Sequence, residues 1–164
     1  MVIGCNFCPF AAKALEKKSI RYRVLPAADI KKSLTLLAEE FEYINADINI
    51  ETTFLIFPGA YGNFMSYLDL VEKAEALLEK ENYEGVYQLA SFHPEYCFAG
   101  SDENDAANYT NRSPYPMLQI LREDSITKAL AFFPDAENIP ITNIDFARKK
   151  GLQYMQLLRV SCME

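Results

Sequence analysis

The chain has 164 residues, a net charge of −7 and a pI near 4.8, and half of its residues are hydrophobic. This length and composition predict a single α/β domain over residues 1–164 with a substantial core. The acidic balance and the scattered basic residues argue against nucleic acid as a partner, because nucleic-acid-binding proteins cluster Lys and Arg on one face. No apolar run approaches the roughly 18 residues of a membrane-spanning helix, so we expect no membrane partner.

The cysteines predict a reducing environment. The chain contains four of them and begins without the basic and apolar segments of a secretory signal peptide. Cysteines in a chain without an export signal are expected to remain free thiols. We therefore expect a cytoplasmic protein. The four residues are Cys5, Cys8, Cys97 and Cys162.

Helical and extended patterns alternate in the first half of the chain. Pro9 suits the first position of a helix, where a missing N–H group costs nothing, so Cys8 is expected at or beside the N-cap. Asp29 and Asn63 are helix-capping residue types, and apolar residues recur at helical spacing after each of them. The expected elements are a turn and helix over 4–18, a strand over 20–25, a helix from 29 to 44, a strand over 52–57 and a helix from 63 to 85.

The second half contains a long polar connection between two strands. The first of these strands ends at Pro94, which cannot donate a hydrogen bond to a sheet. Connections of this length without regular structure are uncommon and are often functional. Thr142 with Asp145 three residues later resembles a capping box. The expected elements are strands over 86–92 and 117–122, a short helix over 102–109, a helix over 125–133 and a last helix from 142 to 158.

This order of elements predicts the fold class. Alternating helices and strands are typical of an α/β (α+β) domain in which helices cover a small sheet. The last two strands have no full crossover helix between them and are therefore expected to be antiparallel. We predict a two-layer sandwich with a four-stranded mixed sheet, ferredoxin-like with an inserted helix.

Cys8 is the first candidate catalytic residue. A thiol at the start of a helix meets free N–H groups, which favour the thiolate and hence a nucleophile. The alternative is a small buried hydrophobic residue. Cys5 and Cys8 form a single CxxC pair, and a zinc site would also require His93 and Cys97. The spacing of those two suits a helix rather than a loop containing Pro94, so we expect no metal ion and no cofactor.

His93 is the second candidate and is the only histidine of the chain. It follows a strand, at the kind of position where α/β proteins bind ligands. It is expected either to act as a general acid or base for Cys8, or to be a core histidine that holds the loop by a hydrogen bond. Both interpretations remain open from the sequence.

Arg112 is the third candidate. Pro114 and Pro116 stiffen the segment that follows it, and a guanidinium on a stiff segment suits bidentate binding of a carboxylate or phosphate. The alternative is a structural salt bridge. The possible partners for that salt bridge are Asp102, Glu103 and Asp105.

Six further polar residues are candidates for substrate binding. Asn108 and Asn111 are expected either to bind a ligand or to satisfy the backbone of the loop. Arg122 ends a strand next to Glu123, with which it is alternatively expected to form an ion pair. The six residues are Asn6, Glu51, Asn108, Tyr109, Asn111 and Arg122.

Four motifs together resemble a bacterial family, domain of unknown function fourteen-fifteen. They are GxNxCPF at residues 4–10, ETT at 51–53, SFHPxYxF at 91–98 and NYTNRSPYP at 108–116. The resemblance implies no established activity. Position 5 is usually aliphatic in that family, so Cys5 is incidental in this pattern and the zinc interpretation is weakened. Gln119 stands where the family usually has His, which implies that no essential base is needed there.

We predict an enzyme that acts on a small anionic molecule. In this hypothesis Cys8 is the thiolate nucleophile, His93 the acid or base and Arg112 the anion anchor, with Asn6 and Asn111 as hydrogen-bond donors. The alternative is a non-catalytic module that binds a small molecule or a partner through the same polar loop. In a third interpretation, the polar residues of the loop satisfy one another and have a structural role only.

Overall fold

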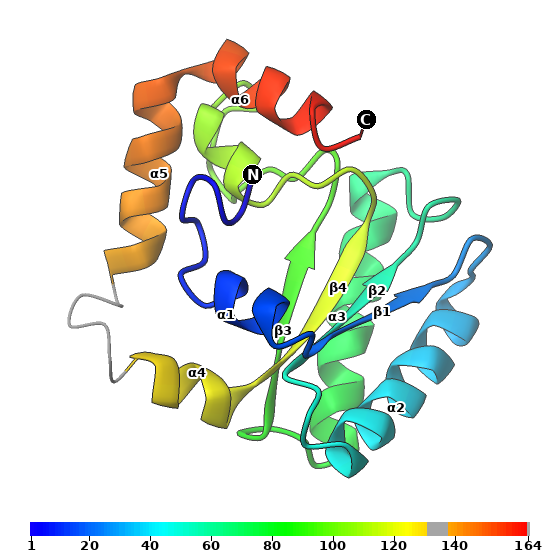
Figure 1. The fold of residues 1–164 in the computed structure, drawn as a ribbon. Coiled ribbons are helices and arrows are strands. Elements are labelled where there is room, and N and C mark those ends of the chain that lie inside the picture. The colour runs from blue at the N-terminus through cyan, green and yellow to red at the C-terminus, as the bar shows by residue number, and fades with distance from the viewer. Residues whose placement is uncertain (131–137, 164) are drawn as a thin grey trace.

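A computed structural model describes residues 1–130 and 138–163 of the chain (Figure 1). The predicted elements other than the last helix are found with shifts at their ends, and the predicted end of one helix at residue 133 lies outside the described residues. The elements are α1 (Ala11–Glu16), β1 (Ile20–Val24), α2 (Ile30–Ala46), β2 (Thr52–Ile56), α3 (Phe64–Lys80), β3 (Tyr87–Phe92), η1 (Ala106–Thr110), β4 (Met117–Arg122), α4 (Glu123–Leu130), α5 (Ile139–Lys150) and α6 (Leu152–Val160).

The four strands form one mixed sheet in the order β1-β2-β4-β3. The strands β1 and β2 are parallel, whereas β4 is antiparallel to both of its neighbours. Thus β2, α3 and β3 form a split βαβ unit with β4 between its strands, as in ferredoxin-like folds. The predicted two-layer sandwich with a mixed sheet and an antiparallel last pair of strands is confirmed.

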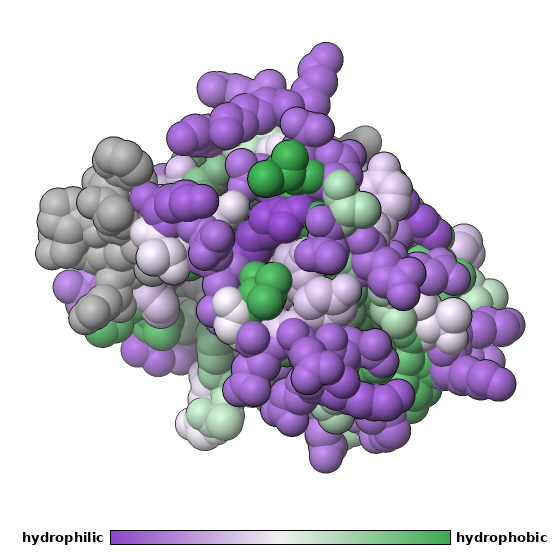
Figure 2. All heavy atoms as spheres, turned by 90° about the horizontal axis from the view of Figure 1, so that it is seen from below, coloured by the Kyte–Doolittle hydropathy of each residue, from purple (hydrophilic) through white to green (hydrophobic). Residues whose placement is uncertain are grey.

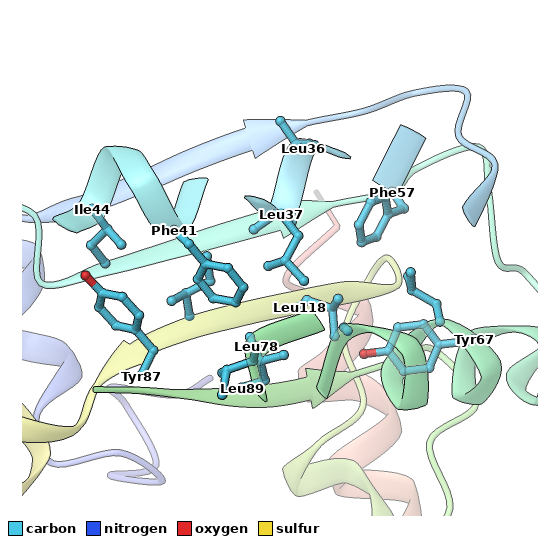
Figure 3. Packing of buried hydrophobic residues seen from close by; sticks show 14 residues of the cluster. Leu36, Leu37, Phe41, Ile44, Phe57, Tyr67, Leu78, Tyr87, Leu89 and Leu118 are labelled. Carbon is cyan, nitrogen blue, oxygen red and sulfur yellow. The ribbon is translucent and has the colours of Figure 1, made fainter. Parts of the chain in front are cut away.

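The main core lies between the sheet and the helices α2 and α3, which cover the same face of the sheet (Figures 1 and 3). Alternate residues of β4, Leu118 and Ile120, point into it and are almost completely buried. Phe41 of α2 stacks on Tyr87 of β3 with ring centroids 5.8 Å apart. Aromatic pairs of this kind add about 0.5–1.5 kcal/mol to the stabilisation from buried area.

Local hydrogen bonds begin the two long helices where the sequence predicts. The side chain of Asp29 accepts a hydrogen bond from the backbone N–H of Lys32 at 2.7 Å. The side chain of Asn63 accepts from the backbone N–H groups of Met65 and Ser66 at 3.0 and 3.2 Å. Each cap satisfies N–H groups that have no partner within the helix.

The prediction of the last helix is wrong in two respects: the helix starts earlier than predicted, and it is divided into two helices. Helix α5 begins at Ile139 with Pro140 in its first turn, so Thr142 lies inside the helix. Gly151 then separates α5 from α6 with φ of 83°, a left-handed conformation that glycine adopts without a steric penalty. The chain therefore turns at Gly151, and α6 packs back towards η1.

A second, smaller core joins the amino-terminal segment to η1, α5 and α6. The ring of Phe7 packs edge-on against Phe146 with centroids 5.6 Å apart. The side-chain amide of Asn143 donates a hydrogen bond to the Phe7 carbonyl at 2.8 Å. The buried members of this cluster are Phe7, Ala106, Tyr109, Ala147 and Met155.

The edge strand β1 is attached to α2 by a buried carboxylate. Glu40 is 1% exposed and accepts hydrogen bonds from Arg21 Nε at 2.7 Å and Arg21 Nη2 at 3.2 Å. Arg23 Nη1 lies 2.8 Å from the same carboxylate. The arginines of β1 therefore face α2, whereas Tyr22 and Val24, which the alternation of apolar residues assigns to the buried side, are exposed.

Candidate functional site

The residues predicted to form one site lie at two ends of the sheet. In the pair of β3 and β4, Tyr87 lies opposite Arg122 and Phe92 lies opposite Met117. His93 follows Phe92, so five residues of strand, roughly 17 Å, separate its end of the sheet from Arg122. Glu51 precedes Thr52, which lies opposite Leu121 at the Arg122 end. Glu51 and Arg122 therefore do not share a pocket with His93.

His93 is fully buried, and both of its ring nitrogens are hydrogen-bonded within the fold. Its Nδ1 accepts a hydrogen bond from the backbone N–H of Glu95 at 3.0 Å and therefore carries no proton. Its Nε2 donates to the carbonyl oxygen of Tyr61 at 2.8 Å. Burial lowers the pKa of His93, which agrees with a neutral ring. These contacts favour a core histidine over an acid–base catalyst.

Asn108 holds the long loop together from inside. It is fully buried, and its Oδ1 accepts a hydrogen bond from the backbone N–H of Phe98 at 3.1 Å. Its Nδ2 donates to the carbonyl oxygen of Asp102 at 2.8 Å. Because no part of this amide is exposed, Asn108 satisfies the loop backbone instead of facing a ligand.

The side chain of Arg112 stabilises the same loop by donating hydrogen bonds to backbone carbonyl groups. Its Nε donates to Tyr96 at 3.0 Å and its Nη2 donates to Glu103 at 2.9 Å. Its guanidinium carbon lies 4.6 Å from the centre of the Tyr109 ring, a cation–π contact. No ion pair joins Arg112 to a carboxylate within residues 1–130 and 138–163, so the salt-bridge alternative is not found there.

Asp105, one of the partners considered for Arg112, pairs with Arg148 instead. Arg148 Nη2 lies 2.6 Å from Asp105 Oδ2. The same carboxylate accepts a hydrogen bond from the backbone N–H of Ala107 at 2.9 Å and caps η1. The hydrogen bonds from Arg148, and then from Ala107, lower the pKa of Asp105 to about 2.

Asn111 connects the loop to the end of β3. Its backbone carbonyl accepts a hydrogen bond from the N–H of His93 at 3.3 Å, and its side-chain Nδ2 donates to the Ser91 carbonyl at 3.4 Å. The side chain of Thr110 donates to its Oδ1 at 3.1 Å. The polar residues between His93 and Ser113 thus satisfy one another and the backbone of the loop. This arrangement agrees with the third interpretation of the sequence, in which these residues have a structural role.

The backbone conformation of the amino-terminal turn explains why Asn stands at position 6. The N–H of Asn6 donates to Ile3 at 3.0 Å and the N–H of Phe7 donates to Val2 at 2.9 Å, which is the bonding pattern of a Schellman turn. Asn6 has φ of 55°, in the left-handed region where Asn is tolerated better than most residues. The turn requires this conformation whether or not a ligand is bound.

Cys8 precedes α1 and is not its N-cap, which is Phe10. The Cys8 carbonyl accepts a hydrogen bond from the N–H of Ala11 at 3.2 Å, so Cys8 begins the turn that leads into the helix. Pro9 is therefore not the first helical residue, and α1 has only six residues. The Cys8 thiol is half-buried and free, with no side-chain hydrogen bond in the part of the chain that the structure describes.

Arg122 closes the carboxyl-terminal end of α2 at the other end of the sheet. Its Nε donates to the Ile50 carbonyl at 2.9 Å, and its Nη2 donates to the carbonyls of Ile44 and, at 3.1 Å, Asp47. A guanidinium at this position also interacts favourably with the helix dipole. No ion pair with Glu123 is found among the described residues, so that alternative is not supported.

Glu51 and Arg122 line a hollow of about 360 Å³ at this end of the molecule. Figure 2 views the molecule from the side on which β3 begins and β4 ends, where hydrophilic residues dominate the surface and a few hydrophobic residues lie among them. Ser125 Oγ donates to the Glu51 carboxylate at 2.6 Å, and Lys17 Nζ lies 3.6 Å from it. The hollow is lined by Ile48, Glu51, Gly85, Val86, Arg122, Asp124, Ser125 and Lys128.

The residues of α4 in this hollow are absent from the predicted site. Asp124, Ser125 and Lys128 come from the short helix that follows β4 directly. Their spacing is ordinary for one face of a helix, and no motif marks them. Only their position after Arg122, itself a predicted site residue, could have identified them.

Two buried side-chain atoms have no hydrogen-bond partner within the described residues. They are Oγ1 of Thr53 and Nε of Arg159. Arg159 lies on α6, one turn after the buried Met155. No ion pair joins Arg159 to a carboxylate in the described ranges, and the structure provides no acceptor that explains the burial of this nitrogen.

No cluster of three or more His, Cys, Asp or Glu side chains that could hold a metal ion is found in residues 1–130 and 138–163. No helix within the same residues is long and apolar enough to cross a membrane.

The family model described as Protein of unknown function (DUF1415) matches residues 1–157 of the chain. The chain belongs to this family. No curated protein and no solved structure matches it significantly. The resemblance found in the sequence is thereby confirmed, and it assigns no reaction to the fold.

In this DUF1415 domain, Gln119 lies in β4, opposite Phe54 of β2 and Ala90 of β3. Its Nε2 donates to Thr52 Oγ1 at 3.0 Å, and Thr52 Oγ1 donates to the Ile120 carbonyl at 2.7 Å. The amide thus links β4 to β2 through side chains. This contact explains why a neutral hydrogen-bonding residue is suitable at position 119.

Proposed function

We propose that this domain binds a small anionic molecule in the hollow between the end of β4 and the start of β2, without covalent chemistry. The observation that carries the proposal is the hollow of about 360 Å³ that brings Arg122, Ser125 and Lys128 together. Sites for small molecules in proteins have volumes of about 300–1,000 Å³, so this one suits a small ligand. The four free cysteines are consistent with a cytoplasmic location.

The position of Arg122 supports an anionic ligand. Its guanidinium is held by backbone carbonyl groups, which fix the side chain without neutralising its charge with a carboxylate. A cation fixed in this way loses little conformational entropy when it binds an anion. Lys128, at the rim, is 79% exposed and can move towards the ligand.

Exchanging Lys128 for Gln should weaken anion binding about threefold, because exposed ion pairs contribute up to about 1 kcal/mol. Lys80→Gln is the matched control, since both lysine side chains are 79% exposed and both lie near a neighbouring carboxylate. The measurement is the rise in Tm produced by a panel of small carboxylates, amino acids and inorganic phosphate. A panel without any stabilising compound, or an equal loss in both variants, would contradict the proposal.

A thiol-dependent enzyme that acts on a small anionic substrate is the second candidate. The observation in its favour is the half-buried Cys8 thiol, whose sulfur forms no hydrogen bond within the described residues. Arg112 would then anchor the anion, and the thiolate would have to form without His93, which the fold occupies. Chemistry at Cys8 is therefore less well supported than binding at the hollow.

Labelling with iodoacetamide distinguishes the two candidates. We expect Cys8 to react more slowly than the exposed Cys162 at neutral pH, because Cys8 is half-buried. Peptide mass spectrometry of wild-type protein over a range of pH measures both rates in one sample, and Cys8→Ser confirms the peptide assignment. Labelling of Cys8 ahead of Cys162 would favour the thiol-dependent enzyme.

A further inference from the structure

The hollow carries charges of both signs. Arg122 and Lys128 supply two cations, and Glu51 and Asp124 supply two carboxylates. We infer that its ligand is a small zwitterion with a carboxylate and a primary ammonium group, of the class of the α-amino acids. This inference rests on the proposed function: it keeps a carboxylate as the group that the cations bind and adds an ammonium group to the same molecule.

Glu51 is suited to accept the ammonium group. Its Oε2 accepts a hydrogen bond from Ser125 at 2.6 Å, and its Oε1 lies 3.6 Å from Lys17 Nζ. A carboxylate has about four lone-pair positions, so these two partners leave room for a further donor. The Glu51 side chain is 34% exposed, which keeps it accessible, while Ser125 fixes its orientation.

A simple anion would fit this set of charges poorly. Such a ligand would gain the attraction of Arg122 and Lys128 but would also meet the like charges of Glu51 and Asp124. A zwitterion satisfies both signs at once when its carboxylate faces the cations and its ammonium group faces Glu51. Lys128 Nζ lies 4.0 Å from Asp124 Oδ2, so the two side chains form only a weak exposed ion pair. Both charges therefore remain available to a ligand.

Two exposed apolar side chains in the lining indicate what the body of the ligand contacts. Ile48 is 86% exposed and Val86 is 44% exposed, although both are hydrophobic. A ligand that covers them removes apolar surface from water, which favours binding. An amino acid with an apolar side chain therefore fits the hollow better than a small polar zwitterion.

Three probes with one carbon skeleton test the inference by calorimetry: leucine, 4-methylpentanoate, which lacks the amine, and 3-methylbutylamine, which lacks the carboxylate. We expect wild-type protein to bind leucine about tenfold more tightly than either of the other two, because each of those lacks one of the two charge-assisted contacts. Glu51→Gln keeps an oxygen that accepts from Ser125 and should reduce that preference to less than about threefold. Glu42→Gln, an exposed glutamate of α2, should leave it unchanged.

Equal binding of leucine and 4-methylpentanoate would overturn the inference that the ligand is a zwitterion, but it would leave the proposed anion site intact. An absence of binding by all three probes, or an unchanged preference in Glu51→Gln, would also overturn the inference. If Glu51→Gln unfolds, Asp124→Asn replaces it, since the Asp124 side chain is 92% exposed and lies at the rim. The comparison of Lys128→Gln with Lys80→Gln decides separately whether the hollow binds anions at all.

Discussion

Replacing Asn108 with Ala should destabilise the domain by about 3 kcal/mol, because it removes two hydrogen bonds made by a fully buried amide and leaves the N–H of Phe98 without its partner. The amide accepts from the N–H of Phe98 and donates to the carbonyl of Asp102, which keeps a hydrogen bond from the N–H of Asp105 at 2.9 Å in the variant. Urea denaturation monitored by circular dichroism measures the change in the free energy of unfolding.

Asn111→Ala is the matched control, since it removes the same amide from the same loop. Asn111 is half-buried, and its Nδ2 contact with the Ser91 carbonyl is long, at 3.4 Å. We expect this variant to lose less than about 1 kcal/mol. Similar losses in the two variants would show that burial of Asn108 is not what stabilises the loop, and a ligand-binding role for Asn108 would regain support.

The sequence predicts local structure well where one residue determines it. Asp29 and Asn63 cap their helices as expected, because a cap depends only on backbone N–H groups two or three residues away. The place of β4 between β2 and β3 depends on contacts between distant strands. The hydrogen-bonding pattern of a single strand does not specify its neighbours, so this order could not be predicted.

Strand β1 shows how tertiary contacts reverse a sequence pattern. Alternation predicts that Tyr22 and Val24 point inward and that the arginines point to solvent. In the structure, Glu40 on α2 binds Arg21 and Arg23, so the charged side of the strand faces the helix. A partner 17 or more residues away in sequence, as Glu40 is from Arg23, leaves no signal in a short window.

The dependence on partners that a short window does not show also explains why the polar loop is predicted as a ligand site. The sequence identified a polar loop rich in hydrogen-bonding residues, and the loop does contain His93, Asn108 and Arg112. Their partners, however, are mostly backbone groups of the loop itself, such as the carbonyl groups that Arg112 binds. Side-chain type predicts that a residue forms hydrogen bonds, but it does not reveal whether the partner is a ligand or the chain.

Replacing Glu40 with Ala should destabilise the domain by about 2 kcal/mol. Removing one partner from a fully buried ion pair costs about 3–5 kcal/mol, because a buried charge remains uncompensated. Here the Arg21 and Arg23 side chains are 23% and 37% exposed, so both guanidinium groups can regain water and the loss is smaller. Arg21 also keeps its contact with the Tyr43 ring at 3.7 Å.

The exposed pair of Arg148 and Asp105 is the control for Glu40, because its geometry is equally good. Arg148 binds both oxygens of Asp105 at 2.6–3.2 Å, but its side chain is 58% exposed. Arg148→Ala should therefore destabilise the domain much less than Glu40→Ala does, because exposed ion pairs contribute little to stability. Urea denaturation of both variants at low and high salt compares them, and Glu40→Ala should remain the more destabilised at each, since its carboxylate is shielded from ions. A loss in Glu40→Ala no greater than in Arg148→Ala would mean that burial of Glu40 adds nothing, and that β1 is held by its hydrogen bonds to β2 alone.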